Sequence, residues 1–66
     1  MKSISGKDLC KLLEKDDWVL KRINGSHHIY FKKGFNARIS VPVHGNKDLK
    51  LGLLKHILKT AEIEMD

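Results

Sequence analysis

The order of hydrophobic patterns along this chain constrains its fold more than any single motif does. Three short runs rich in β-forming residues follow one another, and a stretch with apolar residues at helical spacing lies on either side of them. The Asn-Gly-Ser step between the first two runs is a turn signal that makes them a hairpin. The predicted strands are Trp18–Ile23, His27–Lys32 and Ala37–Val41, and the predicted helices are Gly6–Asp16 and Leu49–Ile63.

Signals at the ends of these elements support the same order. Ser5 is a good N-cap for the first helix, with Asp8 three residues further on as its partner. Pro42 cannot donate to a β-ladder, so we expect the third strand to end before it. Each helix has one apolar stripe, and a sheet has to be covered on one side. The sequence therefore predicts an α+β two-layer sandwich in α-β-β-β-α order, with both helices on one face of a three-stranded antiparallel sheet and the other face open.

Length and composition limit what else the chain contains. Its 66 residues predict a single domain over residues 1–66. Cys10 is the one cysteine, which excludes an intramolecular disulfide and indicates a reducing compartment. The N-terminal stretch is polar and no apolar run approaches the length of a membrane span. We therefore expect a cytoplasmic protein with no membrane partner.

Positive charge is concentrated in the middle and second half of the chain. Lys and Arg number 13 against 8 Asp and Glu, a net charge of +5. Residues 21–60 hold nine of these basic residues and one acidic residue, Asp48, a balance of +8. Such clustering suits a polyanionic partner, and it equally suits a solvated surface that keeps a small protein soluble. Charge alone leaves both interpretations open.

Histidine is the residue type here with the most chemistry to offer. The four histidines and Cys10 lack the spacings of a zinc site, and the basic half has no pair of carboxylates for two-metal catalysis. What remains is a reaction without metal or cofactor in which a histidine moves a proton near neutral pH. RNA supplies its own nucleophile, the 2′-OH, so one histidine among cations would suffice. The alternative is a surface histidine with no role.

Four motifs in order resemble the HicA family of bacterial toxin mRNA interferases. They are the LxxLLExxxW-like opening with Leu9, Leu12, Leu13 and Trp18, the Gly25-Ser26-His27 signature, the VPVH stretch at 41–44, and LLKHILKTAEI at 53–63. The resemblance implies a fold like that of double-stranded RNA-binding domains, cleavage of mRNA, and a HicB antitoxin that covers the active-site histidine. It assigns the catalytic role to His27, the histidine that directly follows Gly-Ser.

The chain departs from the family pattern at four positions. Asp17 and Glu62 replace glycines, Leu53 replaces a threonine, and Lys55 replaces an arginine. None of these changes touches the Gly-Ser-His signature. They bear on helix ends, on the grip on substrate and on the fit to an antitoxin.

The family resemblance and the alternation of side chains along a strand give different roles to the two adjacent histidines. In a regular strand, His27 shares a face with Ile29 and Phe31, and His28 shares the other face with Tyr30. By apolarity the first set looks like core, which predicts a buried His27 and an exposed His28. The resemblance instead selects His27 as catalytic, with supporting roles for Gly25, Ser26 and His28.

Five basic residues are candidates for contact with RNA phosphates, and two other functions remain open. The candidates are Lys32, Lys33, Arg38, Lys47 and Lys55. His56 is expected to face solvent on the last helix. A non-catalytic RNA-binding module would use the same basic face, and a degenerate toxin would bind only its antitoxin partner.

Overall fold

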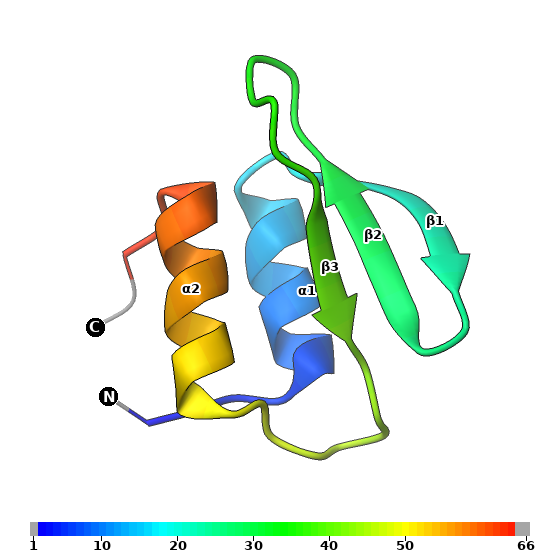
Figure 1. Cartoon of the computed structure of the whole chain (residues 1–66), viewed down its shortest axis with the longest axis vertical. Helices are drawn as coiled ribbons and strands as arrows, with labels where there is room; N and C mark the ends of the chain where they lie inside the picture. The colour runs from blue at the N-terminus through cyan, green and yellow to red at the C-terminus, as the bar shows by residue number, and fades with distance from the viewer. Residues whose placement is uncertain (1, 65–66) are drawn as a thin grey trace.

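A computed structural model describes residues 2–64, and its elements follow the predicted order (Figure 1). The α+β prediction with an α-β-β-β-α order is confirmed. The outermost residues of the predicted domain, at positions 1, 65 and 66, lie outside the described part. No helix within that part is long and apolar enough to span a membrane. The elements are α1 (Gly6–Lys15), β1 (Val19–Asn24), β2 (His27–Phe31), β3 (Ile39–Pro42) and α2 (Leu51–Ala61).

The three strands form one antiparallel sheet in the order β1-β2-β3, so β2 is the central strand. His27 is paired with Asn24 on one side and with Pro42 on the other, and Ile29 is paired in the same way with Arg22 and Ser40. Directly paired residues point their side chains to the same face of an antiparallel sheet. The register therefore places these rows of side chains together on one face.

Pro42 belongs to β3, and the predicted bounds of this strand are wrong at both ends. Ala37 and Arg38 lie in the connection before β3, which begins at Ile39. The N–H of Val43 donates to the carbonyl of Ser26 at 2.8 Å. Hydrogen-bonded and non-bonded pairs alternate along an antiparallel ladder, so the backbone nitrogen of Pro42, the residue before Val43, points away from β2. A proline fits there because its missing N–H would have faced the free edge.

Both helices lie on the same side of the sheet and share one core with it (Figure 1). The core draws on Leu9 and Leu13 from α1 and on Leu54 and Ile57 from α2. The strands contribute Tyr30, Ile39 and Val41, and Trp18 is buried just before β1 rather than inside a strand. We call this side of the sheet the covered face and the opposite side the open face. The helices cover β2 and β3, whereas every residue of β1 is exposed.

Gly6 allows α1 to begin directly against the end of β3. A Cβ atom at this position would lie 2.3 Å from the carbonyl oxygen of Pro42, a distance that no side chain can accept. Ser5 caps the helix as predicted, since its Oγ accepts the N–H of Asp8 at 3.2 Å. The glycine thus fixes how closely the first helix approaches the sheet.

The two helices end in the same way, and each uses a residue that the resemblance marked as a departure. Asp17 has φ 70° and Glu62 has φ 57°, the left-handed conformation that helix ends usually give to glycine. The N–H of Trp18 donates to the carbonyl of Leu13 at 2.9 Å, and that of Ile63 donates to the carbonyl of Leu58 at 2.9 Å. Both helix stops therefore form without glycine. They fall one or two residues before the predicted ends at Asp16 and Ile63.

The start of α2 also differs from the prediction, which placed it at Leu49. The N–H of Leu49 donates to the carbonyl of Ile4 at 2.8 Å, and Ser5 pairs with Asp48 in an isolated antiparallel bridge. These contacts bind the chain before α2 to the N-terminal segment in extended conformation. The helix begins only at Leu51, after this segment has been fixed.

Candidate functional site

His27 and His28 lie on opposite faces of β2, and their surroundings reverse the parity prediction. His27 is exposed on the open face, where its Nδ1 lies 3.1 Å from Oγ of Ser40. His28 is half-buried on the covered face, with its Nδ1 3.9 Å from Sγ of Cys10. The prediction of a buried His27 and an exposed His28 is wrong. The reason is Tyr30, which occupies the core with 1% of its surface exposed and sets the parity of the strand.

Tyr30 reaches the core because its hydroxyl finds a polar partner at the edge of α1. The hydroxyl donates to Oε2 of Glu14 at 2.6 Å. Burial raises the pKa of Tyr30 well above its ordinary value, and its contacts with Cys10 and Glu14 raise that pKa further. Burial likewise raises the pKa of the Cys10 thiol. The Tyr30 hydroxyl and the Cys10 thiol on the covered face therefore stay protonated at neutral pH, and the half-buried His28 lies beside them.

The turn before β2 presents His27 at the edge of an open surface. Gly25 has φ 64°, and a Cβ atom at this position would have no neighbour within 4 Å. Ser26 accepts the N–H of Val43 through its carbonyl, which ties the turn to the end of β3. The Gly25-Ser26 turn is thus anchored on one side and unobstructed on the other. A bound molecule has free access to the imidazole that follows it.

The contact between His27 and Ser40 determines what the ring can do. A serine hydroxyl both donates and accepts, so it serves Nδ1 in either tautomer of the ring. With Nδ1 engaged by Ser40, the second ring nitrogen, Nε2, is the one available to a ligand. When Nδ1–H donates to the serine, Nε2 is a base; once Nε2 has taken up a proton, the imidazolium still donates to the serine from Nδ1 and is an acid at Nε2. The pair is therefore suited to proton transfer at Nε2.

Of the five basic candidates, Arg38 borders the open face, Lys33 lies in the turn after β2, and Lys32 faces the helices. The guanidinium carbon of Arg38 lies 5.5 Å from the centroid of the Phe31 ring. Lys33 is exposed in the turn after β2. Nζ of Lys32 lies 3.3 Å from Oδ2 of Asp16 and is half-buried in this ion pair. A role for Lys32 in RNA binding stays a prediction, and it would require the residue to leave its carboxylate.

The remaining two candidates come from the side of the molecule beyond β3. Lys47 lies in a depression that also includes His44 and Pro42, and Pro42 is the residue paired with His27. Lys55 is exposed on α2, on the side of that helix turned away from β3. The fold therefore brings Lys47 near the end of the sheet that holds His27 and keeps Lys55 apart from it.

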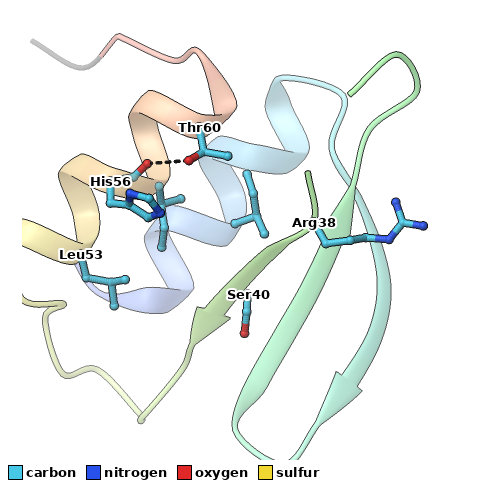
Figure 2. A pocket seen from close by; sticks show the side chains of 7 residues that line it. Arg38, Ser40, Leu53, His56 and Thr60 are labelled. Atoms are coloured by element: carbon cyan, nitrogen blue, oxygen red, sulfur yellow. Dashed lines mark hydrogen bonds between the residues drawn. The ribbon is translucent and has the colours of Figure 1, made fainter. Parts of the chain in front are cut away.

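A groove between β3 and α2 opens beside Ser40 (Figure 2). His56 and Leu53 face this groove from α2, whereas Arg38 extends away from α2 across the sheet. The hydroxyl of Thr60 donates to the carbonyl of His56 at 2.9 Å within the helix. His56 is exposed as predicted, and it lines a groove whose wall includes the serine that contacts His27.

The three strands and their connections contain no acidic residue. None of residues 18–47 is Asp or Glu. Within residues 2–64, no three His, Cys, Asp or Glu side chains converge in a way that would hold a metal ion. The chemistry available on this face is that of imidazole, hydroxyl and cationic groups.

Sequence reasoning missed four residues of the open face: Ser40, Phe31, Lys21 and Arg22. The alternation of Ile39 and Val41 in the sequence puts Ser40 on the face opposite the core. The approach of Ser40 to His27 depends on the register between β2 and β3, which the sequence of the connection from residue 32 to 38 does not specify. Arg22 shares the open face with Lys21, its neighbour in the chain, because of an irregularity in β1, for which the sequence carries no signal.

The elements and the exposed histidine define a small α+β domain of the double-stranded RNA-binding type, with its functional candidates on the open face of the sheet. The sequence profile described as the HicA toxin of bacterial toxin-antitoxin systems matches residues 6–63. The chain belongs to this family and is therefore the toxin component of a bacterial toxin–antitoxin system, in which an antitoxin is its partner. Among curated proteins, none is significantly similar to the chain in sequence.

Proposed function

We propose that this toxin is an endoribonuclease that cleaves mRNA without a metal ion, with His27 as the general acid or base. The observation that carries the proposal is the position of His27. It is exposed on the central strand, it follows an unobstructed Gly-Ser turn, and its Nδ1 contacts Ser40. The same histidine is the one that the family signature selects. His28 has none of these properties.

The reaction needs one proton acceptor and an environment that tolerates negative charge. With Nδ1–H donating to Ser40, Nε2 of His27 takes the proton of a ribose 2′-OH, and the oxygen attacks the adjacent phosphorus. The bond to the 5′-oxygen breaks, and that oxygen takes a proton from water. The products are a 2′,3′-cyclic phosphate and a 5′-OH end. The ring keeps its bond to Ser40 throughout, because imidazolium donates from both nitrogens.

Cations on the same face support the phosphate during this reaction. Arg22 is paired with Ile29 in the row next to His27, and it is exposed on β1. Arg38, from the connection before β3, lies further along this face beside Phe31. A guanidinium donates two parallel hydrogen bonds to phosphate oxygens, which suits the extra charge of a pentacoordinate phosphorus.

The antitoxin in this proposal is of the HicB type and covers His27. The face around His27 is open to solvent and free of acidic residues from position 18 to 47. A partner with acidic side chains would complement this surface and exclude RNA from it. Diethyl pyrocarbonate modifies exposed imidazoles, so the extent of modification of His27 shows whether the antitoxin covers it. We expect His27 to react in the free toxin and to be protected in the complex.

Cleavage of a synthetic RNA with defined ends by the purified toxin tests the proposed activity. We expect cleavage in the presence of EDTA, with 2′,3′-cyclic phosphate and 5′-OH ends. An RNA with a 2′-deoxyribose at the cut position should stay intact there, because its nucleophile is missing. His27→Ala should lower the rate by about 10²–10⁴-fold, the usual contribution of a general acid or base.

His56→Ala is the matched control, since it removes another exposed imidazole, which belongs to α2 and not to the strand that carries His27. This variant should cut RNA at the wild-type rate. Products with 3′-OH and 5′-phosphate ends would contradict the mechanism. A wild-type protein that binds RNA, leaves it intact and loses no affinity in His27→Ala would instead be the non-catalytic RNA-binding module.

A further inference from the structure

Two cations converge on one half-exposed aromatic ring of the open face. Nζ of Lys21 lies 5.6 Å and the guanidinium carbon of Arg38 lies 5.5 Å from the centroid of the Phe31 ring. The cations come from β1 and from the connection before β3, while the ring belongs to β2. Within residues 2–64, neither cation is paired with a carboxylate. Three segments thus build one cluster, which we call the Phe31 cluster.

An irregularity in β1 lies at Lys21, the first cation of this cluster. The register shifts between Leu20, which is paired with Tyr30, and Arg22, which is paired with Ile29. The extra residue is Lys21, so Lys21 and Arg22 together lie opposite Ile29. The bulge therefore puts two adjacent cations on the open face, and Lys21 is the one that lies over Phe31.

An anion would complete this arrangement. A single cation over an exposed aromatic ring is enough for a cation–π contact. A second cation on the same ring adds repulsion between like charges. A phosphate between Lys21 and Arg38 would turn this repulsion into attraction, and it would free a face of the ring for a flat partner.

The position of the cluster relative to His27 defines which nucleotide it would hold. His27 and Phe31 are four residues apart on one strand and share the open face, so they are separated by about 13 Å at the usual rise per residue. One nucleotide cannot span this distance and also be cut at His27. The cluster therefore suits a nucleotide further along the same strand of RNA.

We propose that Phe31, Lys21 and Arg38 form a subsite for an unpaired nucleotide that flanks the cleavage point. Its base stacks on Phe31, and its phosphate is bound by the two cations. The inference rests on the proposed ribonuclease function and adds the substrate class. A base can stack on a side chain only when it is free of its duplex partner, so the toxin acts on single-stranded RNA.

Binding of a short, unpaired 2′-O-methyl RNA tests the subsite without requiring cleavage, since this RNA lacks the nucleophile. Stacking of one base contributes about 1–3 kcal/mol, so Phe31→Leu should weaken binding by about 5–150-fold. Phe31→Trp keeps an aromatic ring and should bind at least as tightly as the wild type. Ile23→Ala, a matched loss of an exposed apolar side chain elsewhere on β1, should leave the affinity unchanged.

Cleavage assays then separate this proposal from the ribonuclease proposal. Phe31→Leu should raise KM for a ten-nucleotide RNA and leave cleavage of a dinucleotide unchanged, whereas His27→Ala should abolish both. If the wild type binds RNA in a way that depends on Phe31 but does not cleave it, only the ribonuclease proposal is overturned. Equal binding by Phe31→Leu and the wild type would overturn the subsite, as would equal cleavage of the same RNA in a duplex. If Phe31→Leu weakened binding of the antitoxin but not of RNA, the cluster would belong to the antitoxin interface instead.

Discussion

His27 and His28 are neighbours in the chain, but β2 sends their side chains into opposite surroundings. On the covered face, His28 lies beside Cys10, and the buried Tyr30 donates to Glu14 at the edge of α1. On the open face, Nδ1 of the exposed His27 lies 3.1 Å from the exposed hydroxyl of Ser40 on the neighbouring strand. The covered face is thus packed into the core, whereas the open face is accessible and is where we propose the chemistry. Substitutions on the two faces should therefore act on different properties.

Neighbouring residues of β3 give the largest expected difference in stability. Val41 is fully buried on the covered face, and Val41→Ala should lower the free energy of unfolding by about 2–3 kcal/mol through lost burial and a cavity. Ser40 is exposed on the open face, and Ser40→Ala should change the free energy of unfolding by at most about 0.5 kcal/mol. Ser40→Ala should instead slow RNA cleavage, with kcat affected more than KM. Urea unfolding and cleavage rates measured on both variants check this contrast.

The hydroxyl of Tyr30 should contribute about 1–2 kcal/mol to the free energy of unfolding, because this buried residue donates to a carboxylate at the edge of α1. Tyr30→Phe should lower the free energy of unfolding by this amount and leave RNA cleavage unchanged. A large loss of cleavage with normal stability would break the separation of the two faces.

The same residue predicts how stability depends on pH. The pKa values of Tyr30 and Cys10 are raised in the folded protein above their ordinary values of 10.0 and 9.0. The stabilising contribution of each group is complete below its ordinary pKa and is lost as the pH rises above it, because the unfolded chain then releases the proton first. We expect the free energy of unfolding to fall above about pH 9 and to fall less steeply in Tyr30→Phe. A flat profile up to pH 11 would contradict the assignment.

Two glycines should respond in opposite directions to the same substitution. Gly6→Ala brings a Cβ atom against the carbonyl of Pro42 and should cost about 1–2 kcal/mol, as overpacking does. Gly52 lies inside α2 with no atom near its missing Cβ, so Gly52→Ala should stabilise by about 0.5–1 kcal/mol. Thermal unfolding of the two variants gives both signs in one experiment. Equal effects would show that the approach of α1 to β3 is not under the constraint described.

The helix ends give the smallest expected effects. Asp17→Gly and Glu62→Gly each relieve a left-handed conformation and should stabilise by about 0.5–1 kcal/mol. The gains should add, because the two helix ends are separate structures in the chain. Neither variant should alter RNA cleavage, which thermal unfolding and the cleavage assay test together.

The sequence predicts the elements of this fold well and the faces of its sheet poorly. Apolar periodicity and the Asn-Gly-Ser turn are local signals, so the order of helices and strands follows from them. Apolarity alone assigned Ile29 and Phe31 to the core. It does not take into account the hydrogen bond from the Tyr30 hydroxyl to Glu14, which allows Tyr30 to be buried instead. Ser40 approaches His27 through the register of β2 and β3, and Arg22 joins the open face through a bulge in β1; both depend on how separate strands pair. The family signature selected His27, the histidine that strand parity had wrongly predicted to be buried.

The central claim is that function lies on the open face and stability on the covered face, and the two histidines test it most directly. Cleavage rate and free energy of unfolding should be measured together on His27→Ala and His28→Ala. The account predicts that His27→Ala folds with wild-type stability and loses cleavage by about 10²–10⁴-fold. It predicts that His28→Ala keeps its cleavage rate while it is folded and loses about 1 kcal/mol of stability. A His28→Ala protein that is stable but inactive, beside an active His27→Ala, would contradict it.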